Sequence, residues 1–191
     1  MADATVGHRG EADLSPLRFG TILFLASELL FFGGLFAAYF ALRSETVPWP
    51  PAGVELATGL SAIGTALLLV SSFTFQAAVG RAERGDLRAM RRWVLASFLL
   101  GAAFLAIQAY DWNAIAFSVS THAYGTIYFA MTGFHGLHVV AGLALMAVVV
   151  GRAAQGAYRD GSIDGLESVA YYWHFVDVVW IALFATIFLL R

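Results

Sequence analysis

Residues 56–80 read LATGLSAIGTALLLVSSFTFQAAVG and contain no charged side chain. A helix rises about 1.5 Å per residue, so about 20 apolar residues cross the hydrocarbon core of a bilayer. Runs such as Ala66–Val70 are continuously apolar and do not alternate as the strands of a membrane barrel would. Because every backbone polar group must be paired within the bilayer, this stretch is predicted to be a transmembrane helix.

Four further segments are almost free of charge. Residues 93–110 and 123–151 contain none when His is counted as neutral, residues 19–42 contain only Glu28, and residues 168–190 contain only Asp177. The sequence therefore predicts an all-α membrane protein, a bundle of five transmembrane helices. We expect these helices at about residues 19–42, 55–80, 92–111, 123–152 and 168–190, within a transmembrane domain over residues 19–191. A polar tail over residues 1–18 precedes them, and Ser15-Pro16 is typical of a helix start.

The composition excludes several classes of protein. Of the 191 residues 60% are hydrophobic and 13% charged, whereas soluble proteins carry about 25% charged residues. The net charge of −2 gives no basis for binding nucleic acid. The absence of cysteine excludes disulfides, thiolate metal sites and thiol nucleophiles. No nucleophile motif or phosphate-binding glycine loop is present, so we expect no catalytic residue in this chain.

The distribution of arginine predicts the orientation in the membrane. One side carries nine arginines and the other two, and cytoplasmic connections are the ones enriched in basic residues. The N-terminus is therefore expected in the cytoplasm and the C-terminus outside. The nine are Arg9, Arg18, Arg81, Arg84, Arg88, Arg91, Arg92, Arg152 and Arg159, and the two are Arg43 and Arg191.

Five ionisable residues lie inside the predicted helices: Glu28, His135, His138, His174 and Asp177. Such residues are costly in lipid and are candidates for function. Glu28 and Asp177 lie roughly 14 Å from the cytoplasmic end and His138 roughly 20 Å, by the rise per residue. Three helices thus place polar groups at similar depth.

The three histidines allow two interpretations. In the first, the histidines form a buried polar network with Asp177 by donating hydrogen bonds to carbonyl or carboxylate groups on neighbouring helices. Alternatively they bind a metal or haem, which needs histidines on facing helices with supporting partners. We favour the first interpretation and expect no metal site.

Glu28 is expected to be protonated, because removal from water disfavours the anion. It is either a structural carboxyl bonded to a neighbouring helix or a proton-handling or lipid-facing group. Gly20, Ser27, Gly34 and Ala41 recur every seven residues along the same segment, and this stripe predicts a face on which another helix packs closely.

The connection over residues 81–88 and the basic residue at the end of the fourth helix also have two interpretations. In the first interpretation they anchor the protein at the cytoplasmic surface and form local ion pairs. In the second they contact lipid headgroups or a partner subunit. The residues concerned are Arg81, Glu83, Arg84 and Arg152.

Five strings together resemble one family, subunit III of the haem-copper cytochrome c oxidases. They are residues 27–33 (SELLFFG), 49–51 (WPP), 83–86 (ERGD), 132–139 (TGFHGLHV) and 172–180 (YWHFVDVVW). The resemblance covers nearly the whole chain from about residue 15 and is greatest to the short actinobacterial form. Longer members have seven helices, two of them separated from the other five by a lipid-filled cleft. The resemblance implies that the first helix here matches their third.

The resemblance also implies a role. The family member is a non-catalytic subunit of a proton-pumping oxidase in the bacterial plasma membrane and packs on subunit I, which holds haem and copper. It supports proton uptake, protection against turnover damage and a lipid-lined route for oxygen. Glu28 matches the family's buried glutamate, and Arg152 matches a basic residue that meets phospholipid headgroups. Further implied partners are other oxidase subunits, bound phospholipid and a supercomplex with a cytochrome bc complex; no cofactor is expected in this chain.

Other functions remain open at this stage. The chain could be subunit III of a quinol oxidase or a homologue associated with nitric oxide reductase, although residues 27–28 and 49–51 favour the cytochrome c branch. It could also be a small proton or ion transporter that uses Glu28 and Asp177, or a membrane cytochrome that uses its histidines.

Overall fold

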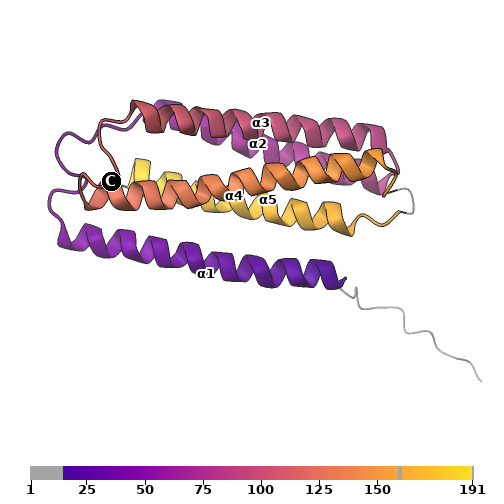
Figure 1. Cartoon of the computed structure of the whole chain (residues 1–191), viewed down its shortest axis with the longest axis horizontal. Helices are drawn as coiled ribbons and strands as arrows, with labels where there is room; N and C mark the ends of the chain where they lie inside the picture. The colour runs from indigo at the N-terminus through magenta and orange to yellow at the C-terminus, as the bar shows by residue number, and fades with distance from the viewer. Residues whose placement is uncertain (1–14, 159–160, 191) are drawn as a thin grey trace, which may run out of the picture.

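The computed structural model describes residues 15–158 and 161–190 as five long helices, with no strand among these residues. The helices are α1 (Pro16–Glu45), α2 (Thr58–Glu83), α3 (Leu87–Ala114), α4 (Ala123–Ala154) and α5 (Asp164–Phe184), and α5 continues into the π-helical turn η1 (Ala185–Leu189). Successive helices run in opposite directions, so the α1–α2 and α3–α4 connections lie at one end of the bundle and the α2–α3 and α4–α5 connections at the other (Figure 1). All five are long and apolar enough to span a membrane, so the predicted all-α bundle is confirmed.

The predicted helix ends need correction. The predicted ends follow the first charged residues on either side of each apolar stretch, but α3 and α5 begin earlier, at Leu87 and Asp164. Asp86 caps α3 by accepting a hydrogen bond from the Ala89 N–H, and Asp164 lies in the first turn of α5, where a negative charge favours the helix dipole. Charged residues thus extend the helices beyond the apolar core. α2 begins at Thr58 rather than residue 55, and most of the predicted tail lies outside the described residues.

The predicted start at Ser15-Pro16 is confirmed. Ser15 is the N-cap of α1 and its hydroxyl accepts a hydrogen bond from the Arg18 N–H at 3.4 Å, while Pro16 occupies the first helical position. Proline fits there because its missing N–H would have no partner in the first turn.

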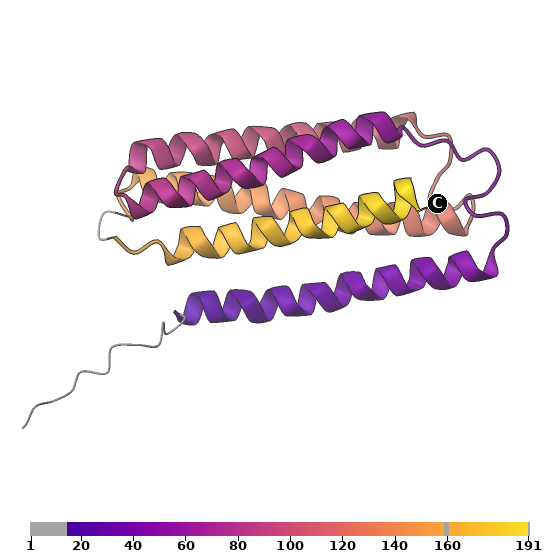
Figure 2. The same ribbon diagram turned by 180° about the vertical axis from the view of Figure 1, so that it is seen from behind.

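Helices α2 to α5 form the compact part of the bundle, and α1 lies along one side of it (Figures 1 and 2). Only 6% of the most apolar stretch of α1 is buried, against 28–56% in the other four helices. Helix α1 therefore offers most of its surface to lipid or to another protein.

Trp173 of α5 fills the centre of the four-helix part. A Cβ atom at Gly142 of α4 would lie 2.6 Å from its ring, and one at Gly101 of α3 would lie 2.8 Å away. The Trp173 Nε1–H donates to the Ser71 hydroxyl of α2 at 2.9 Å. Small residues let helices approach in a membrane, and the indole then joins them by packing and by one hydrogen bond.

Polar contacts hold both ends of α1. At its first turn Arg18 forms an ion pair with Asp164 of α5 at 2.6 Å and a second one with Glu167. At its far end the Tyr39 hydroxyl donates to the Thr186 carbonyl at 3.2 Å and accepts from the Trp49 Nε1–H at 3.0 Å. A helix with so little buried surface depends on such contacts for its position.

The arginines separate as the sequence predicts. Those that the structure describes at the end where α1 begins are Arg18, Arg81, Arg84, Arg88, Arg91, Arg92 and Arg152. Arg43 lies at the opposite end of the bundle, whereas Arg9, Arg159 and Arg191 lie outside the described residues. The basic end is the one that the positive-inside rule assigns to the cytoplasm, so the orientation stays a prediction with a direct test.

The chain has no cysteine, so single cysteines can report the orientation. Ser118 lies in the α3–α4 connection and Ser162 in the α4–α5 connection, and both are exposed. We expect Ser118→Cys to react with a membrane-impermeant maleimide added to intact cells and Ser162→Cys to react only after lysis. The opposite pattern would invert the topology.

Close packing at Trp173 predicts a difference between two glycines. Gly142→Ala forces a methyl group into the Trp173 ring, and we expect it to destabilise the protein by about 1–3 kcal/mol. Gly33→Ala in α1 is the matched control, because nothing lies within 4 Å of its Cβ position. Thermal unfolding in detergent measures both, and equal midpoints for the two variants would contradict this account of the core.

Candidate functional site

Glu28 of α1 and His138 of α4 meet inside the membrane-spanning region. The Glu28 Oε2 lies 3.0 Å from the His138 Nε2, and the two side chains are only 20% and 16% exposed. The His138 Nδ1 lies 2.7 Å from the Phe134 carbonyl of the preceding turn. The sequence placed both residues at similar depth, and the structure brings them into contact.

The hydrogen bond to Phe134 fixes the protonation of the imidazole. A carbonyl only accepts hydrogen bonds, so the hydrogen on the imidazole lies at Nδ1. The contact with Glu28 then contains one proton, either on the carboxyl, which donates to Nε2, or on Nε2, which donates to the carboxylate. Both forms have no net charge, which a low-dielectric environment requires.

Aromatic rings surround this pair. The Phe32 ring lies 5.1 Å from the His138 ring in an edge contact, and the Tyr172 ring lies 6.4 Å away, stacked on it. The Tyr172 hydroxyl donates to the His138 carbonyl at 3.0 Å. The rings fix the position of the imidazole and limit the access of water to the pair.

His174 joins α5 to α2 at a separate place. Its Nε2 lies 3.2 Å from the Gln76 Oε1 and its Nδ1 lies 2.7 Å from the Ser72 hydroxyl. Because the amide oxygen only accepts, the hydrogen lies on Nε2 and the Ser72 hydroxyl donates to Nδ1. Asp177 lies one turn further along α5, is 4% exposed, and its carboxyl lies near the same Ser72 hydroxyl.

His135 is fully buried in a third place. Its ring packs on Trp180 at 4.9 Å and on Phe104 at 5.8 Å, and neither ring nitrogen has a hydrogen-bond partner among the described residues. The four residues grouped as one polar network thus occupy three separate places. Within residues 15–158 and 161–190, no three His, Asp or Glu side chains are close enough to hold a metal ion.

Two polar contacts near the end of the bundle opposite the basic end were not predicted from the sequence. The Tyr128 hydroxyl donates to the Asp111 Oδ2 at 3.0 Å, and the Gln108 Nε2–H donates to the Thr132 carbonyl at 2.9 Å. Asp111 was assigned to the end of a helix and Gln108 was not considered because it is not ionisable. Their spacing of three residues places them on one face of α3, which is the signal that could have found them.

The basic residues predicted to contact lipid or a partner are all exposed at the same end of the bundle. Among the described residues, Arg81, Glu83 and Arg84 form no ion pair, so the expected local pairing is not seen there. Arg152 borders a groove of about 750 Å³ between α1, α4 and α5. Burial raises the pKa of Tyr158, which lines the same groove, so its hydroxyl stays neutral beside Arg152.

These features define a class of protein: a multi-pass membrane bundle whose intramembrane polar residues join neighbouring helices. The sequence model of the family described as cytochrome c oxidase subunit III matches residues 1–190. The chain belongs to the cytochrome c oxidase subunit III family.

Relatives support the same assignment. A probable cytochrome c oxidase subunit 3 from Nocardia farcinica is 44% identical over 176 residues, which cover 90% of this chain and 87% of the relative. Another from Mycobacterium tuberculosis is 43% identical with the same coverage. A cytochrome c oxidase subunit 3 from Synechocystis is 39% identical over 96% of this chain and 79% of its own length.

The resemblance drawn from five strings is therefore confirmed. The chain is a non-catalytic subunit of an oxidase complex that contains subunit I, and it is a multi-pass membrane protein. The cytochrome c branch is the one supported, in place of the quinol-oxidase, nitric-oxide-reductase, transporter and cytochrome alternatives.

Proposed function

We propose that this chain supports electron transfer to oxygen and coupled proton translocation, with Glu28 and His138 as a proton-holding pair. The observation that carries the proposal is the 3.0 Å contact between a carboxyl and an imidazole whose other nitrogen is already bonded. A pair of this kind accepts or releases a proton at one defined place. Its depth is roughly 14–20 Å from the basic end by the rise per residue, so it lies well inside the bilayer.

The proposal assigns the redox chemistry to other subunits. Haem and copper belong to subunit I and its partners, and this chain contributes a proton-holding group, packing surfaces and lipid contacts. The histidines support this division, because each lies in a different setting: His138 bonds Glu28, His174 bonds Ser72 and Gln76, and His135 packs between rings.

The purified single subunit is accordingly expected to show no Soret band and no stoichiometric metal. Visible absorption and elemental analysis of the chain, expressed without its partners, measure this. One haem per chain would overturn the accessory role and restore the cytochrome alternative.

The groove at Arg152 supports a contact with phospholipid. Its walls are apolar side chains such as Phe24, Leu145 and Val148, and Arg152 lies at its cytoplasmic end. An anionic headgroup at the guanidinium with acyl chains along the groove satisfies both features. A lipid there would also fill the space between α1 and the bundle, and apolar chains dissolve oxygen on a route toward subunit I.

The open face of α1 supports a contact with a further membrane segment of the complex. Ser27, Gly34 and Ala41 are all exposed, and no atom lies within 4 Å of a Cβ position at Gly34, whereas Gly20 of the same stripe borders the groove at Arg152. Such a stripe allows close approach of a helix from another oxidase subunit. The bacterial relatives support the plasma membrane as the location, and association with a cytochrome bc complex stays a prediction of the resemblance.

Glu28→Gln tests the proton-holding role. The amide donates to the His138 Nε2 as a protonated carboxyl does, so the helices stay joined while titration is lost. We expect the complex to keep its haem spectrum and most of its initial oxygen consumption. We expect fewer protons translocated per electron, or a shorter lifetime during turnover. Glu45→Gln at the exposed end of the same helix is the control and should leave both unchanged.

Two results would contradict this proposal. Loss of the first turnovers in an assembled Glu28→Gln complex would place Glu28 in the oxygen chemistry itself. If the number of protons translocated per electron and the lifetime during turnover were both unchanged, the pair would have a structural role only. Reaction with a hydrophobic carbodiimide, which requires a protonated carboxyl reachable from lipid, gives an independent readout that Glu28→Gln should abolish.

A further inference from the structure

Helix α4 begins at a cap that can take up a proton. His122 is its N-cap residue, and the His122 Nδ1 accepts a hydrogen bond from the Gly125 N–H at 2.8 Å. Serine, threonine, aspartate and asparagine are the usual residues at this position, as Ser15 of α1 and Asp86 of α3 illustrate. Of these three caps, histidine is the one whose charge changes in the range of about pH 5 to 8.

The bond to Gly125 requires a neutral imidazole. A backbone N–H only donates, so the His122 Nδ1 is the bare nitrogen and the hydrogen of the imidazole lies on Nε2. In the imidazolium ion both nitrogens carry hydrogen, so a protonated His122 cannot accept this bond. Its positive charge would also lie at the N-terminus of α4, where the helix dipole favours a negative charge. Protonation therefore removes a stabilising contact and adds an unfavourable one.

The surroundings of His122 hold no opposite charge that would offset protonation. The described charged residues at this end of the bundle are Arg43, Glu45, Glu55 and Asp111. None of them forms an ion pair with His122. The groups in ring contact with the imidazole are Phe117 at 5.1 Å and Tyr124 at 6.1 Å, and a phenol is uncharged in this pH range.

The first turn of α4 and the α3–α4 connection are packed together. A Cβ atom at Gly125 would lie 2.5 Å from the Ser118 carbonyl oxygen, so the two backbones are in close contact. The Thr126 hydroxyl donates to the Val119 carbonyl at 2.7 Å. Because these contacts need the first turn in its helical position, loss of the cap loosens the connection as well.

The same turn also contacts the segment that holds one end of α1. Tyr124 is fully buried, and its ring lies 5.0 Å from the Trp49 ring in the α1–α2 connection. The Trp49 Nε1–H donates to the Tyr39 hydroxyl of α1, which donates to the Thr186 carbonyl. Since α1 buries little surface, a displacement of Tyr124 changes one of the few contacts that position this end of the helix.

We propose that His122 is a proton-sensitive cap of α4. When the side of the membrane opposite the basic end becomes acidic, His122 takes up a proton and its bond to Gly125 breaks. The first turn of α4 and the α3–α4 connection then loosen, and Tyr124 transmits the change to Trp49. His122 has no contact with Glu28 or His138, so this device is independent of the proton-holding pair.

Hydrogen–deuterium exchange of the intact complex in nanodiscs tests the proposal at about pH 8 and about pH 5.5. Each exchange rate is divided by that of the same peptide unfolded at the same pH, so the chemical effect of pH cancels. We expect residues 116–126 to exchange about tenfold faster, on this scale, at the lower pH, since a cap is lost and a charge opposes the dipole. Residues 46–54 should change in the same direction by a smaller factor.

Two variants show whether His122 is the group responsible. His122→Asn keeps an acceptor for the Gly125 N–H and does not titrate, so residues 116–126 should stay protected at both pH values. His122→Ala removes the acceptor, so these residues should exchange fast at both.

Three results would contradict the proposal. An absence of pH dependence in the natural chain would show that His122 does not act as a proton-sensitive cap. The same pH dependence in His122→Asn would assign the response to another group. A response of residues 116–126 without one of residues 46–54 would overturn the transmission to Trp49.

Discussion

The 3.0 Å contact between the Glu28 carboxyl and the His138 imidazole joins α1 to the rest of the bundle within the membrane-spanning region. In hydrocarbon a polar group without a partner costs several kcal/mol, whereas a carboxyl and an imidazole that share a proton are neutral together. Helix α1 buries little apolar surface, so this contact and the ion pairs of Arg18 set where it lies. The position of α1 in turn defines the groove at Arg152 and the open face available to a partner.

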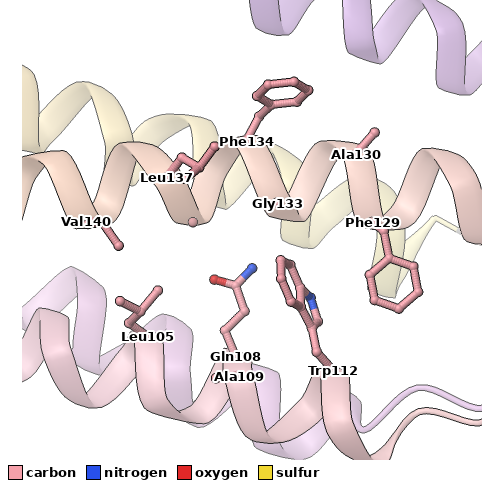
Figure 3. Close-up of a pocket in the computed structure, with 11 residues that line it drawn as sticks. Leu105, Gln108, Ala109, Trp112, Phe129, Ala130, Gly133, Phe134, Leu137 and Val140 are labelled. Atoms are coloured by element: carbon pink, nitrogen blue, oxygen red, sulfur yellow. The ribbon is translucent and has the colours of Figure 1, made fainter. Parts of the chain in front are cut away.

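The two grooves differ in the chemistry that they offer. The groove at Arg152 combines a cation with apolar walls, whereas no charged residue lines the second groove, which lies between α3 and α4 and is bordered by Gln108 (Figure 3). Arg152 and Gln108 each lie near the C-terminal end of their helix. Because α4 and α3 run in opposite directions, the two grooves lie toward opposite ends of the bundle.

The five helices could be predicted because long stretches without charge have few alternatives in a membrane. The shared depth of Glu28 and His138 followed from counting residues, yet their contact depends on how each helix is rotated, which packing around Trp173 and the rings decides. The partners of His174, Ser72 and Gln76, are uncharged, and Gln108 is not ionisable. A prediction based on ionisable residues therefore does not include these three side chains. Helix ends were less predictable, because caps such as Asp86 and first-turn acids such as Asp164 extend helices past the apolar runs.

A double-mutant cycle on Glu28 and His138 tests the central claim most directly. The free energy of unfolding of the purified complex is measured for Glu28→Leu, for His138→Leu and for both together. If the pair shares a proton, each single variant leaves a buried partner unpaired, and the cycle should give a coupling energy of about 1–3 kcal/mol. Strictly additive effects would show that the two side chains are neighbours without an interaction, and would contradict the account.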